Sequence, residues 1–400
     1  MKEGWELVTL GDLCGFVRGP FGGSLKKSCF VESGNAVYEQ QHAIYDQFTD
    51  IRYFVDDEKF NELKRFELLP GDLIMSCSGT MGKVAIVPAS IKKGIINQAL
   101  LKLTPSAIIN VFFLRLWMIS PGFQESLAQN TVGAAIKNVA SVKILKQITT
   151  PIPPLSEQEE IVEVLDKAFA AIDQAKANIE QNIANAKELF QSRLNQIFSQ
   201  KGEGWVETTL GEVCAKTKNI KWQEHVNEEF EYIDLSSVSR DTLNVIETTT
   251  VSNKTAPSRA KKIVLEGDVI FATTRPTLRR ATIINSDLSG QICSTGYVVL
   301  RSNESLSSDW IFFYLLTSVF MDRMEELQRG ASYPAVTDND VKSSILSIPT
   351  SKTLENNNVS SMNQLRDETD TLVFQYQTKL ASLDELKKSI LQKAFAGELT

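Results

Sequence analysis

The chain has 400 residues, of which 42% are hydrophobic and 23% are charged, values that are ordinary for a globular protein. This length predicts roughly two to three domains at about 150 residues each, and the formal net charge of −7 excludes a general polycation. Five cysteines without a CxxC pair exclude a zinc ribbon. We expect reduced thiols and a cytoplasmic protein, because the opening MKEGWELVTL also lacks the apolar region of a signal peptide.

A repeat of half the chain organises the sequence. The stretch GWELVTLGDLC (Gly4–Cys14) returns 200 residues later as GWVETTLGEVC (Gly204–Cys214). Further pairs follow in the same order: residues 37–44 with 231–238, residues 69–87 with 265–284, Gly133 with Gly330, and residues 187–200 with 384–397. Retained order with a drifting offset indicates two copies of one module whose loops have diverged.

Each copy is predicted to begin with a head that mixes strands and helices. In residues 1–153 the short apolar runs GDLIMS and KVAIVP are bounded by Gly and Pro, as strands are. In residues 201–350 the runs GDVIFAT and ATIINS repeat the pattern. We therefore predict an α+β protein with two mixed α/β domains related by an internal pseudo-two-fold repeat.

Each head is followed by a predicted long helix, over residues 154–200 and 351–400. Apolar or small residues recur at alternating spacings of four and three, the period of a coiled-coil seam. The predicted seam consists of Ile161, Leu165, Ile172, Ile179, Leu189, Leu365, Leu372, Tyr376, Leu383, Leu386 and Ile390. We expect the helices to pair as a rod of about 65–70 Å that holds the heads apart; the alternative is that each helix packs only on its own head.

Motifs of enzyme active sites are missing from the sequence. It contains no HExxH and no GxSxG, and GTMGKV (Gly79–Val84) lacks the spacing of a phosphate loop. We therefore predict no catalytic residues, no metal site and no cofactor. The chain is expected to be a binding protein.

Two heads on a rod suit a ligand with two parts, and double-stranded DNA is such a ligand. We predict base contacts from amide, hydroxyl, arginine and tyrosine side chains, and phosphate contacts from lysine and arginine. The predicted base readers are Gln40, Gln41, Ser78, Thr80, Arg275 and Tyr333, and the predicted phosphate contacts are Lys26, Lys27, Lys83, Arg279 and Arg280. Arg18, which opens the glycine-rich RGPFGGSLKKS stretch, is a further predicted DNA-binding residue. The alternative for each residue is a place on a solvated rim.

Neither head is strongly cationic. Residues 1–150 hold 16 basic and 14 acidic residues, and residues 201–350 hold 16 and 20. Either the basic residues gather on one face, or another protein supplies much of the phosphate neutralisation.

The sequence resembles the specificity (S) subunits of type I restriction–modification systems. The resemblance rests on the repeated W-x-x-x-x-L-G-[DE]-[LV]-C start, on GPFGGSLKKS, on the two GD[LV]-type strand pairs, on IPPLSEQEEIVEVLD and on the final LKKSILQKAFAGELT. It covers the whole chain and departs from the pattern at SKTLENNNV, which stands where the first copy has PPLSEQEEIV.

The resemblance implies target-recognition domains at 1–153 and 201–350 and spacer helices at 154–200 and 351–400 that pack antiparallel. Each domain would read one half of a bipartite DNA target, and the helices would set the spacing between the halves. The implied partners are two methyltransferase (modification) subunits and ATP-dependent restriction subunits, which would carry the catalysis. The alternatives are a two-headed scaffold that binds only proteins through its coiled coil, and an enzyme that acts on DNA by itself.

Overall fold

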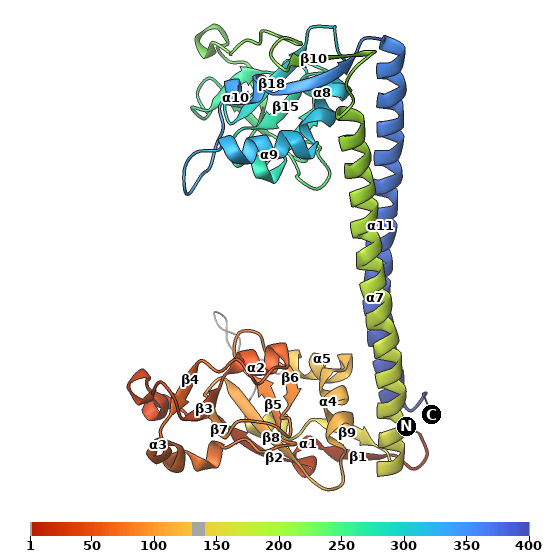
Figure 1. Ribbon diagram of the computed structural model, residues 1–400. Helices are drawn as coiled ribbons and strands as arrows, with labels where there is room; N and C mark the ends of the chain where they lie inside the picture. Colours follow the sequence, from red (N-terminus) through yellow and green to blue (C-terminus); the bar gives the residue numbers. More distant parts are fainter. Residues whose placement is uncertain (1, 130–140, 400) are drawn as a thin grey trace. The chain divides into compact units, whose positions relative to one another are not determined.

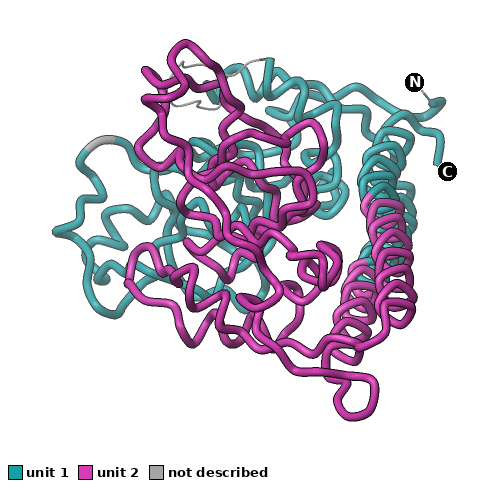
Figure 2. The backbone as a smooth tube through the Cα atoms, turned by 90° about the horizontal axis from the view of Figure 1, so that it is seen from above, with its two compact units in different colours: residues 1–179, 378–400 teal, residues 180–377 magenta. Residues whose placement is uncertain are grey.

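The computed structural model describes residues 2–129 and 141–399, and the chain divides into two compact units (Figures 1 and 2). Unit 1 comprises Met1–Ile179 and Thr378–Thr400, and unit 2 comprises Glu180–Gln377. Each unit contains a head of strands and short helices together with one stretch of each long helix, α7 (Leu155–Phe198) and α11 (Lys352–Ala396). The first head runs from β1 to β9 and the second from β10 to β19.

The first head is built from short strands arranged in three sheets. Its strands are β1 (Glu6–Thr9), β2 (Cys14–Arg18), β3 (Asn35–Tyr38), β4 (Tyr53–Val55), β5 (Leu73–Ser76), β6 (Val84–Ile86), β7 (Gly94–Ile96), β8 (Leu100–Pro105) and β9 (Thr149–Ile152). The sheet orders are β1-β9, β2-β8-β5-β6 and β4-β3-β7, and the β3–β7 pair is parallel while the other pairs are antiparallel. The short apolar runs GDLIMS and KVAIVP form β5 and β6 of one sheet.

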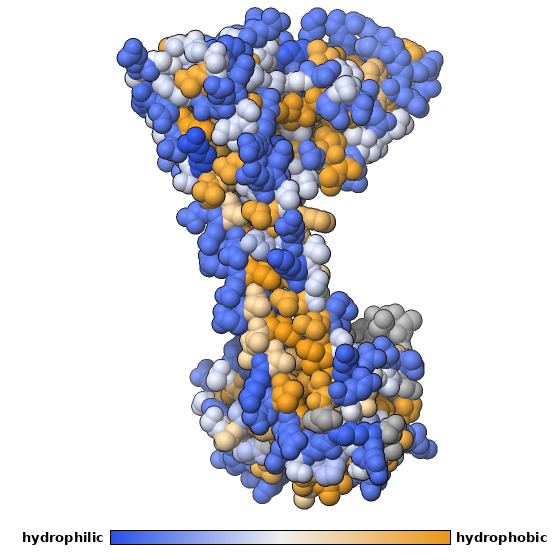
Figure 3. All heavy atoms as spheres, turned by 90° about the vertical axis from the view of Figure 1, so that its right-hand side faces the viewer, coloured by the Kyte–Doolittle hydropathy of each residue, from blue (hydrophilic) through white to orange (hydrophobic). Residues whose placement is uncertain are grey.

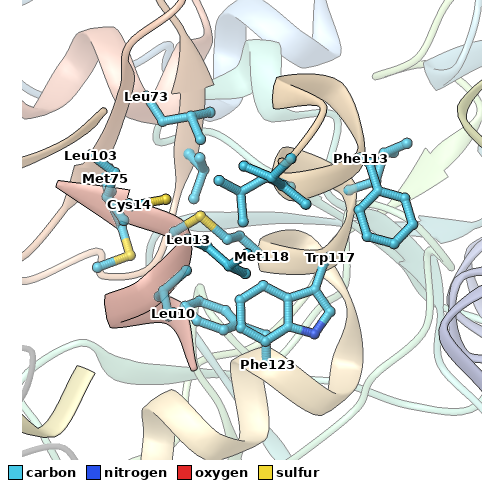
Figure 4. Packing of buried hydrophobic residues seen from close by; sticks show 14 of the residues in the cluster. Leu10, Leu13, Cys14, Leu73, Met75, Leu103, Phe113, Trp117, Met118 and Phe123 are labelled. Carbon is cyan, nitrogen blue, oxygen red and sulfur yellow. The ribbon is translucent and has the colours of Figure 1, made fainter. Parts of the chain in front are cut away.

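Helices pack on the sheets of the first head and close its hydrophobic clusters. The helices are α1 (Leu10–Leu13), α2 (Gln40–Tyr45), α3 (Asp57–Glu62), α4 (Val111–Ile119), α5 (Pro121–Gln129) and α6 (Val142–Leu145). In Figure 4 the side chains of Leu13, Met118 and Trp117 gather between the strands and helices α4 and α5. The Trp117 and Phe123 rings lie 4.8 Å apart between centroids. Because this core also contains Leu165 of α7, the head is packed firmly on its own helix stretch.

The second head repeats this arrangement. Its strands are β10 (Trp205–Thr209), β11 (Cys214–Ala215), β12 (Glu229–Ile233), β13 (Thr249–Ser252), β14 (Ala260–Ile263), β15 (Val269–Ala272), β16 (Ala281–Ile283), β17 (Ile292–Ser294), β18 (Tyr297–Ser302) and β19 (Ile345–Pro349), and its helices are α8 (Ser308–Leu315), α9 (Ser318–Leu327) and α10 (Asp338–Lys342). The sheet orders are β10-β19, β11-β18-β15-β16 and β13-β12-β17-β14. The orders match those of the first head strand for strand, with β14 added, so the predicted α+β repeat is confirmed.

The long helices pack against each other in opposite directions within each unit. In unit 1, Lys176 Nζ lies 2.8 Å from Asp384 Oδ1 and Lys387 Nζ lies 3.2 Å from Asp173 Oδ1, so the residue number rises along one helix as it falls along the other. In unit 2, Leu194 of α7 shares a core with Met362 of α11 and with the second head. The predicted antiparallel pairing is therefore confirmed, and the alternative of helices that pack only on their heads is excluded.

The helix seam departs from the predicted one at three positions. Ile161, Leu165 and Ile172 are buried and Ile179 is half-buried, as are Leu365, Tyr376, Leu383 and Ile390 in the second helix. The prediction is wrong for Leu189, Leu372 and Leu386, which are 61%, 42% and 45% exposed.

Their neighbours take the inner positions, namely Phe190, Val373 and Lys387. An α-helix makes a turn in 3.6 residues, so a strict 3.5-residue repeat drifts by about 20° per heptad. The packed face makes one extra step of four residues, from Ile179 to Ile183 on α7 and from Thr369 to Val373 on α11.

The cysteines are unpaired, as expected for reduced thiols. Burial raises the pKa of Cys14 and Cys293 to about 12 and that of Cys77 and Cys214 to about 11, which makes these thiols poor nucleophiles. Among the described residues, none of the helices is both long and apolar enough to cross a lipid bilayer.

Candidate nucleic-acid interface

In the first head, several predicted site residues meet at one end of the β2-β8-β5-β6 sheet. Arg18, the last residue of β2, pairs with Leu101 in the same sheet region where Ser76, the last residue of β5, pairs with Leu100. The turn from Cys77 to Lys83 leaves β5 at this end. Arg18, Ser78, Thr80 and Lys83 therefore share one edge of the head, which we call the first edge.

Hydrogen bonds hold the turn of the first edge in shape. The backbone N–H of Lys83 donates to Ser76 Oγ at 3.0 Å, and the N–H of Gly82 donates to the Ser76 carbonyl at 2.9 Å. Gly82 has φ of +74° and its carbonyl accepts from the Gln124 amide of α5 at 3.0 Å. A glycine tolerates this left-handed backbone. The fixed turn exposes the side chains of Thr80 and Lys83.

Gln40 borders the first edge, whereas the neighbouring Gln41 and His42 hold a loop. The backbone N–H of Asn97 donates to the Tyr38 carbonyl at 2.9 Å, and Gly19 packs directly on Asn97, so the start of α2 lies beside the end of β2. Gln41 Nε2 donates to the Asp50 carbonyl at 3.1 Å, and His42 Nε2 lies 3.1 Å from the same oxygen. The Gln40 amide makes no side-chain hydrogen bond within the part of the chain that the structure describes.

Lys26 and Lys27 lie on the segment that follows β2, apart from the turn of the first edge. Both are exposed, and the segment is anchored by Leu25 and Phe30 against the core that contains Val37. Their exposure suits contact with phosphate, but the structure does not join them to Thr80 or Lys83 by a hydrogen bond.

In the second head, the corresponding loop Thr273–Arg280 joins a loop from a distant part of the chain. Thr273 is fixed by its hydroxyl, which donates to the Gly296 carbonyl at 2.9 Å. The N–H of Arg275 donates to the Pro334 carbonyl at 2.7 Å, and Thr274 forms a β-bridge with Ala335. The loops 273–280 and 329–335 therefore form one surface, which we call the second edge.

Arginines and a tyrosine occupy the second edge. Arg275 and Arg279 are exposed and have φ of +52° and +53°, a left-handed backbone that non-glycine residues rarely adopt. The Arg275 guanidinium lies 4.7 Å from the centre of the Tyr333 ring. Arg279 Nη1 lies 3.5 Å from Gln191 Oε1 of α7. Arg275 and Tyr333 are thus brought into contact, and Arg279 lies on the same loop as Arg275. The first head's counterpart of the tyrosine loop (residues 329–335), around Gly133, lies outside the described residues.

Arg280 points into the second head instead of outward. Its Nη1 donates to the Leu235 carbonyl, and the Tyr297 hydroxyl donates to the Asp234 carbonyl at 3.0 Å. Burial raises the pKa of Tyr297, which keeps the hydroxyl protonated as a donor. Arg280 therefore fastens the loop after β12 to the second edge, a role that sequence reasoning missed. This geometry does not suit the predicted phosphate contact.

Sequence reasoning also missed Arg329 and the loop after β12. The Arg329 side chain is exposed at the base of the tyrosine loop, with Nη2 3.8 Å from Asp340 Oδ1. The loop after β12 corresponds to the start of α2, as the pairing of residues 37–44 with 231–238 indicates. The repeat alignment could have pointed to this loop, because equivalent strand ends border equivalent edges.

The residues of the two edges are suited to binding and not to metal chemistry. Within residues 2–129 and 141–399, groups of His, Cys, Asp and Glu that could hold a metal ion are absent. The edges present amide, hydroxyl, guanidinium and ammonium groups together with one aromatic ring. These groups can donate hydrogen bonds to base edges and neutralise phosphates.

Comparisons with known proteins agree on one family. The family model described as the type I restriction modification DNA specificity domain matches residues 2–185 and again residues 202–382. The chain is 24% identical to the type I restriction enzyme EcoDI specificity subunit of Escherichia coli over 318 residues, which cover 71% of this chain and 69% of that protein. It is 30% identical to the EcoBI specificity subunit of Escherichia coli over 138 residues, a match that spans 34% of this chain and 29% of that protein.

Solved structures share the fold. The HsdS subunit from Thermoanaerobacter tengcongensis superposes with a TM-score of 0.63 at 18% identity, covering 100% of this chain and 98% of that one. A chain from a structure described as "Structural basis underlying complex assembly and conformational transition of the type I R-M system" gives a TM-score of 0.78 at 17% identity, with coverage of 100% and 99%. The resemblance seen in the sequence is confirmed, and with it a subunit whose role is specificity and not catalysis. Because both copies of the repeat match separately, the chain belongs to the family of type I restriction–modification DNA specificity domains.

Proposed function

We propose that this chain is the DNA-recognition subunit of a type I restriction–modification complex and that each head reads one half of a bipartite target. The observation that carries this proposal is the repeated sheet order with different side chains on equivalent edges. Because the two heads share one framework but carry different residues on their edges, each head can recognise a different half-site. Reading by loops at the end of a rigid sheet also places donors where they can reach base edges.

The structure supports some predicted contacts more than others. Gln40, Ser78 and Thr80 are the base readers that we propose for the first head. Lys26, Lys27, Lys83 and Arg279 are the proposed phosphate contacts, with Arg18 bordering the first edge. We leave out Gln41 and Arg280, because both side chains hold loops of their own head.

The long helices are proposed to set the distance between the half-sites. We assign residues 1–153 and 201–350 to target recognition and residues 154–200 and 351–400 to this spacer. The antiparallel packing observed within each unit supports the assignment, because paired helices resist bending better than one helix does.

The partners that we propose are two modification subunits and the restriction subunits of the same system. Figure 3 shows apolar side chains gathered on one face of the paired long helices, in the lower half of the view. In the helix stretches of unit 1, Val164 and Leu386 are 42% and 45% exposed. A gathered apolar patch on a helix face suits contact with another protein. Because neither head is strongly cationic, the modification subunits would also contact and neutralise the DNA phosphates.

We propose that the complex is located in the cytoplasm, because its target is DNA and the thiols of this chain are reduced.

Footprinting of the complex with its modification subunits tests this function. We expect two protected segments separated by an unprotected gap. Thr80→Ala combined with Lys83→Ala should weaken protection of one segment first, whereas Lys388→Ala on the exposed face of α11 should change neither. A single continuous footprint, or the absence of protection, would contradict the proposal and favour a scaffold that binds only proteins.

A further inference from the structure

Tyr333 stands at the tip of a loop that is closed at its base and tied to its neighbour. Arg329 and Ala335 exchange two backbone hydrogen bonds, each of 2.9 Å. The N–H of Val336 donates to the Thr273 carbonyl at 2.9 Å, beside the bond from Arg275 to Pro334. The loop is therefore held at its base from two sides, and its tip has a defined position relative to the second head.

The Tyr333 ring has one face covered and the remainder exposed. The Arg275 guanidinium lies 4.7 Å from the ring centre, and its Nη2 lies 3.5 Å from the Ser332 carbonyl. The residue is nevertheless 69% exposed. Since the guanidinium is engaged with the ring and with a carbonyl of the same loop, Arg275 is placed to orient the tyrosine.

The Tyr333 ring is the aromatic group of an edge that carries several cations. Arg275 lies against the ring, and Arg279 and Arg329 belong to the two loops that form the second edge. In the major groove of DNA, the apolar feature among the base edges is the methyl group of thymine. An exposed ring on an edge that also carries cations therefore matches a thymine in a groove bordered by phosphates.

Insertion of the ring between two base pairs fits the geometry less well. An inserted side chain contacts bases on both faces and requires unstacking, which costs a few kcal/mol per step. One face of Tyr333 is already covered by Arg275. A one-sided contact with a methyl group needs neither a second free face nor unstacking.

We propose that Tyr333 recognises a thymine in one half-site through contact with its 5-methyl group, and that Arg275 is a positioning residue that orients the ring. This inference rests on the proposed function. It replaces the prediction that Arg275 reads a base directly, because the guanidinium serves the tyrosine.

Replacing thymine by deoxyuracil removes only this methyl group and provides the test. The complex with its modification subunits is titrated against its target duplex, with each thymine of both half-sites replaced in turn. At one position the wild type should bind about fourfold more weakly, the effect of one buried carbon. Tyr333→Ala should bind both duplexes equally, whereas Tyr333→Phe should keep the discrimination because it keeps the ring.

Variants of the arginines separate positioning from charge. Arg275→Ala should lower the discrimination between thymine and deoxyuracil, and Arg275→Lys should restore it only in part, because an ammonium lacks the planar face of a guanidinium. Arg329→Ala is the matched control from the same loop. It should weaken binding to both duplexes by the same factor.

Three results would overturn the inference. One is a wild-type complex that binds a bipartite target but is indifferent to deoxyuracil at every position. Another is Tyr333→Ala with undiminished discrimination. The third is a rise in the emission of 2-aminopurine beside the contacted step that depends on Tyr333, which would show insertion. A wild-type complex without any bipartite target would instead refute the proposed function.

Discussion

The two copies of the repeat use different chemistry at the same junction between head and helix. In the first copy, the fully buried Gln158 of α7 accepts from the N–H of Asn110 at 2.8 Å and donates to the carbonyls of Ile108 and Pro153. In the second copy, Glu355 of α11 accepts from the N–H of Ser307 at 2.7 Å. Both residues thus bond the residue that caps the next helix of the head, α4 or α8.

A glutamate cannot donate as a glutamine does, and the second copy compensates with a lysine. Lys352 Nζ lies 2.8 Å from Glu355 Oε2, on the other carboxylate oxygen. The segment SKTLENNNV departs from the family pattern, but its Lys352 and Glu355 preserve the contact between the helix and the head with different residues. The framework of the junction is therefore retained as a set of satisfied hydrogen bonds and not as a set of identical residues.

The buried aspartates at the start of β5 and β15 should give the largest difference between the copies. Asp268 accepts from Arg301 at 2.8 and 2.7 Å, whereas Asp72 accepts from Thr104 at 2.6 Å with Lys102 Nζ 3.8 Å away. We expect Asp268→Ala to lower the free energy of unfolding by about 3 kcal/mol, since it leaves a partly buried guanidinium unpaired.

Asp72→Ala should cost less, about 2 kcal/mol, because Lys102 keeps its bond to the Glu67 carbonyl. Hydrogen exchange of the β5 and β15 amides measures both losses in the intact chain. An equal or larger loss at Asp72 would show that the pairing with Arg301 does not distinguish the copies.

Placing the glutamate and lysine of the second junction into the first copy should show whether the lysine can compensate for a glutamate there too. Gln158→Glu sets a carboxylate oxygen against the Ile108 and Pro153 carbonyls, and we expect a loss of about 2 kcal/mol. Adding Leu155→Lys, at the position equivalent to Lys352, should recover about half of it. Leu155→Lys alone is the control and should stay within about 0.5 kcal/mol, because Leu155 is exposed. Exchange of the α4 amides reports these values, and a double variant no more stable than Gln158→Glu would refute the compensation.

Acidification should distinguish the copies at the same junction. Burial opposes the charge on Glu355, but the hydrogen bonds from Lys352 and Ser307 outweigh it and hold the pKa of this carboxyl below its usual value. The charged form therefore stabilises the fold above the unfolded pKa of about 4.3, and this contribution is lost as the pH falls through the lower, folded pKa.

Glu355→Gln should cost about 1 kcal/mol at pH 7 and progressively less below about pH 4. Melting temperatures of both proteins across this range give the difference, and Gln158→Ala, which removes no titrating group, is the control. A cost of Glu355→Gln that grows on acidification would contradict the assigned direction of the pKa.

Removal of a proposed phosphate contact should give the smallest effects on DNA binding, and these effects should be similar in the two copies. Lys83→Ala and Arg279→Ala should each lower the slope of log affinity against log salt by about 1 without changing the preferred sequence. Lys59→Ala is the control: Lys59 lies on α3, outside the loops that form the edges, and its Nζ lies 2.7 Å from Glu62 Oε2. A change in sequence preference would show that the residue reads a base.

Sequence periodicity predicted the structural elements that depend on residues close together along the chain. The repeat, the strands of the GD[LV] stretches and both long helices follow from local patterns. The seam prediction failed at Leu189, Leu372 and Leu386, because the sequence repeat was followed without the drift of a 3.6-residue helix.

Contacts between distant segments were beyond sequence reasoning. Arg275 and Tyr333 were both singled out, but their contact depends on bonds between loops some 58 residues apart. Arg280 and its neighbour Arg279 look alike in sequence, yet one is turned to the Leu235 carbonyl and the other is exposed. The direction of a side chain at a turn depends on tertiary packing that the local sequence does not encode.

The most direct test of the central claim is sequencing of methylated DNA from cells that carry this chain and its modification subunits. Wild type should methylate one bipartite motif. Ser78→Ala with Thr80→Ala should relax one half of the motif only, and Tyr333→Ala should relax only the other half. Relaxation of both halves by either variant, or one continuous motif, would contradict a division of reading between the two heads.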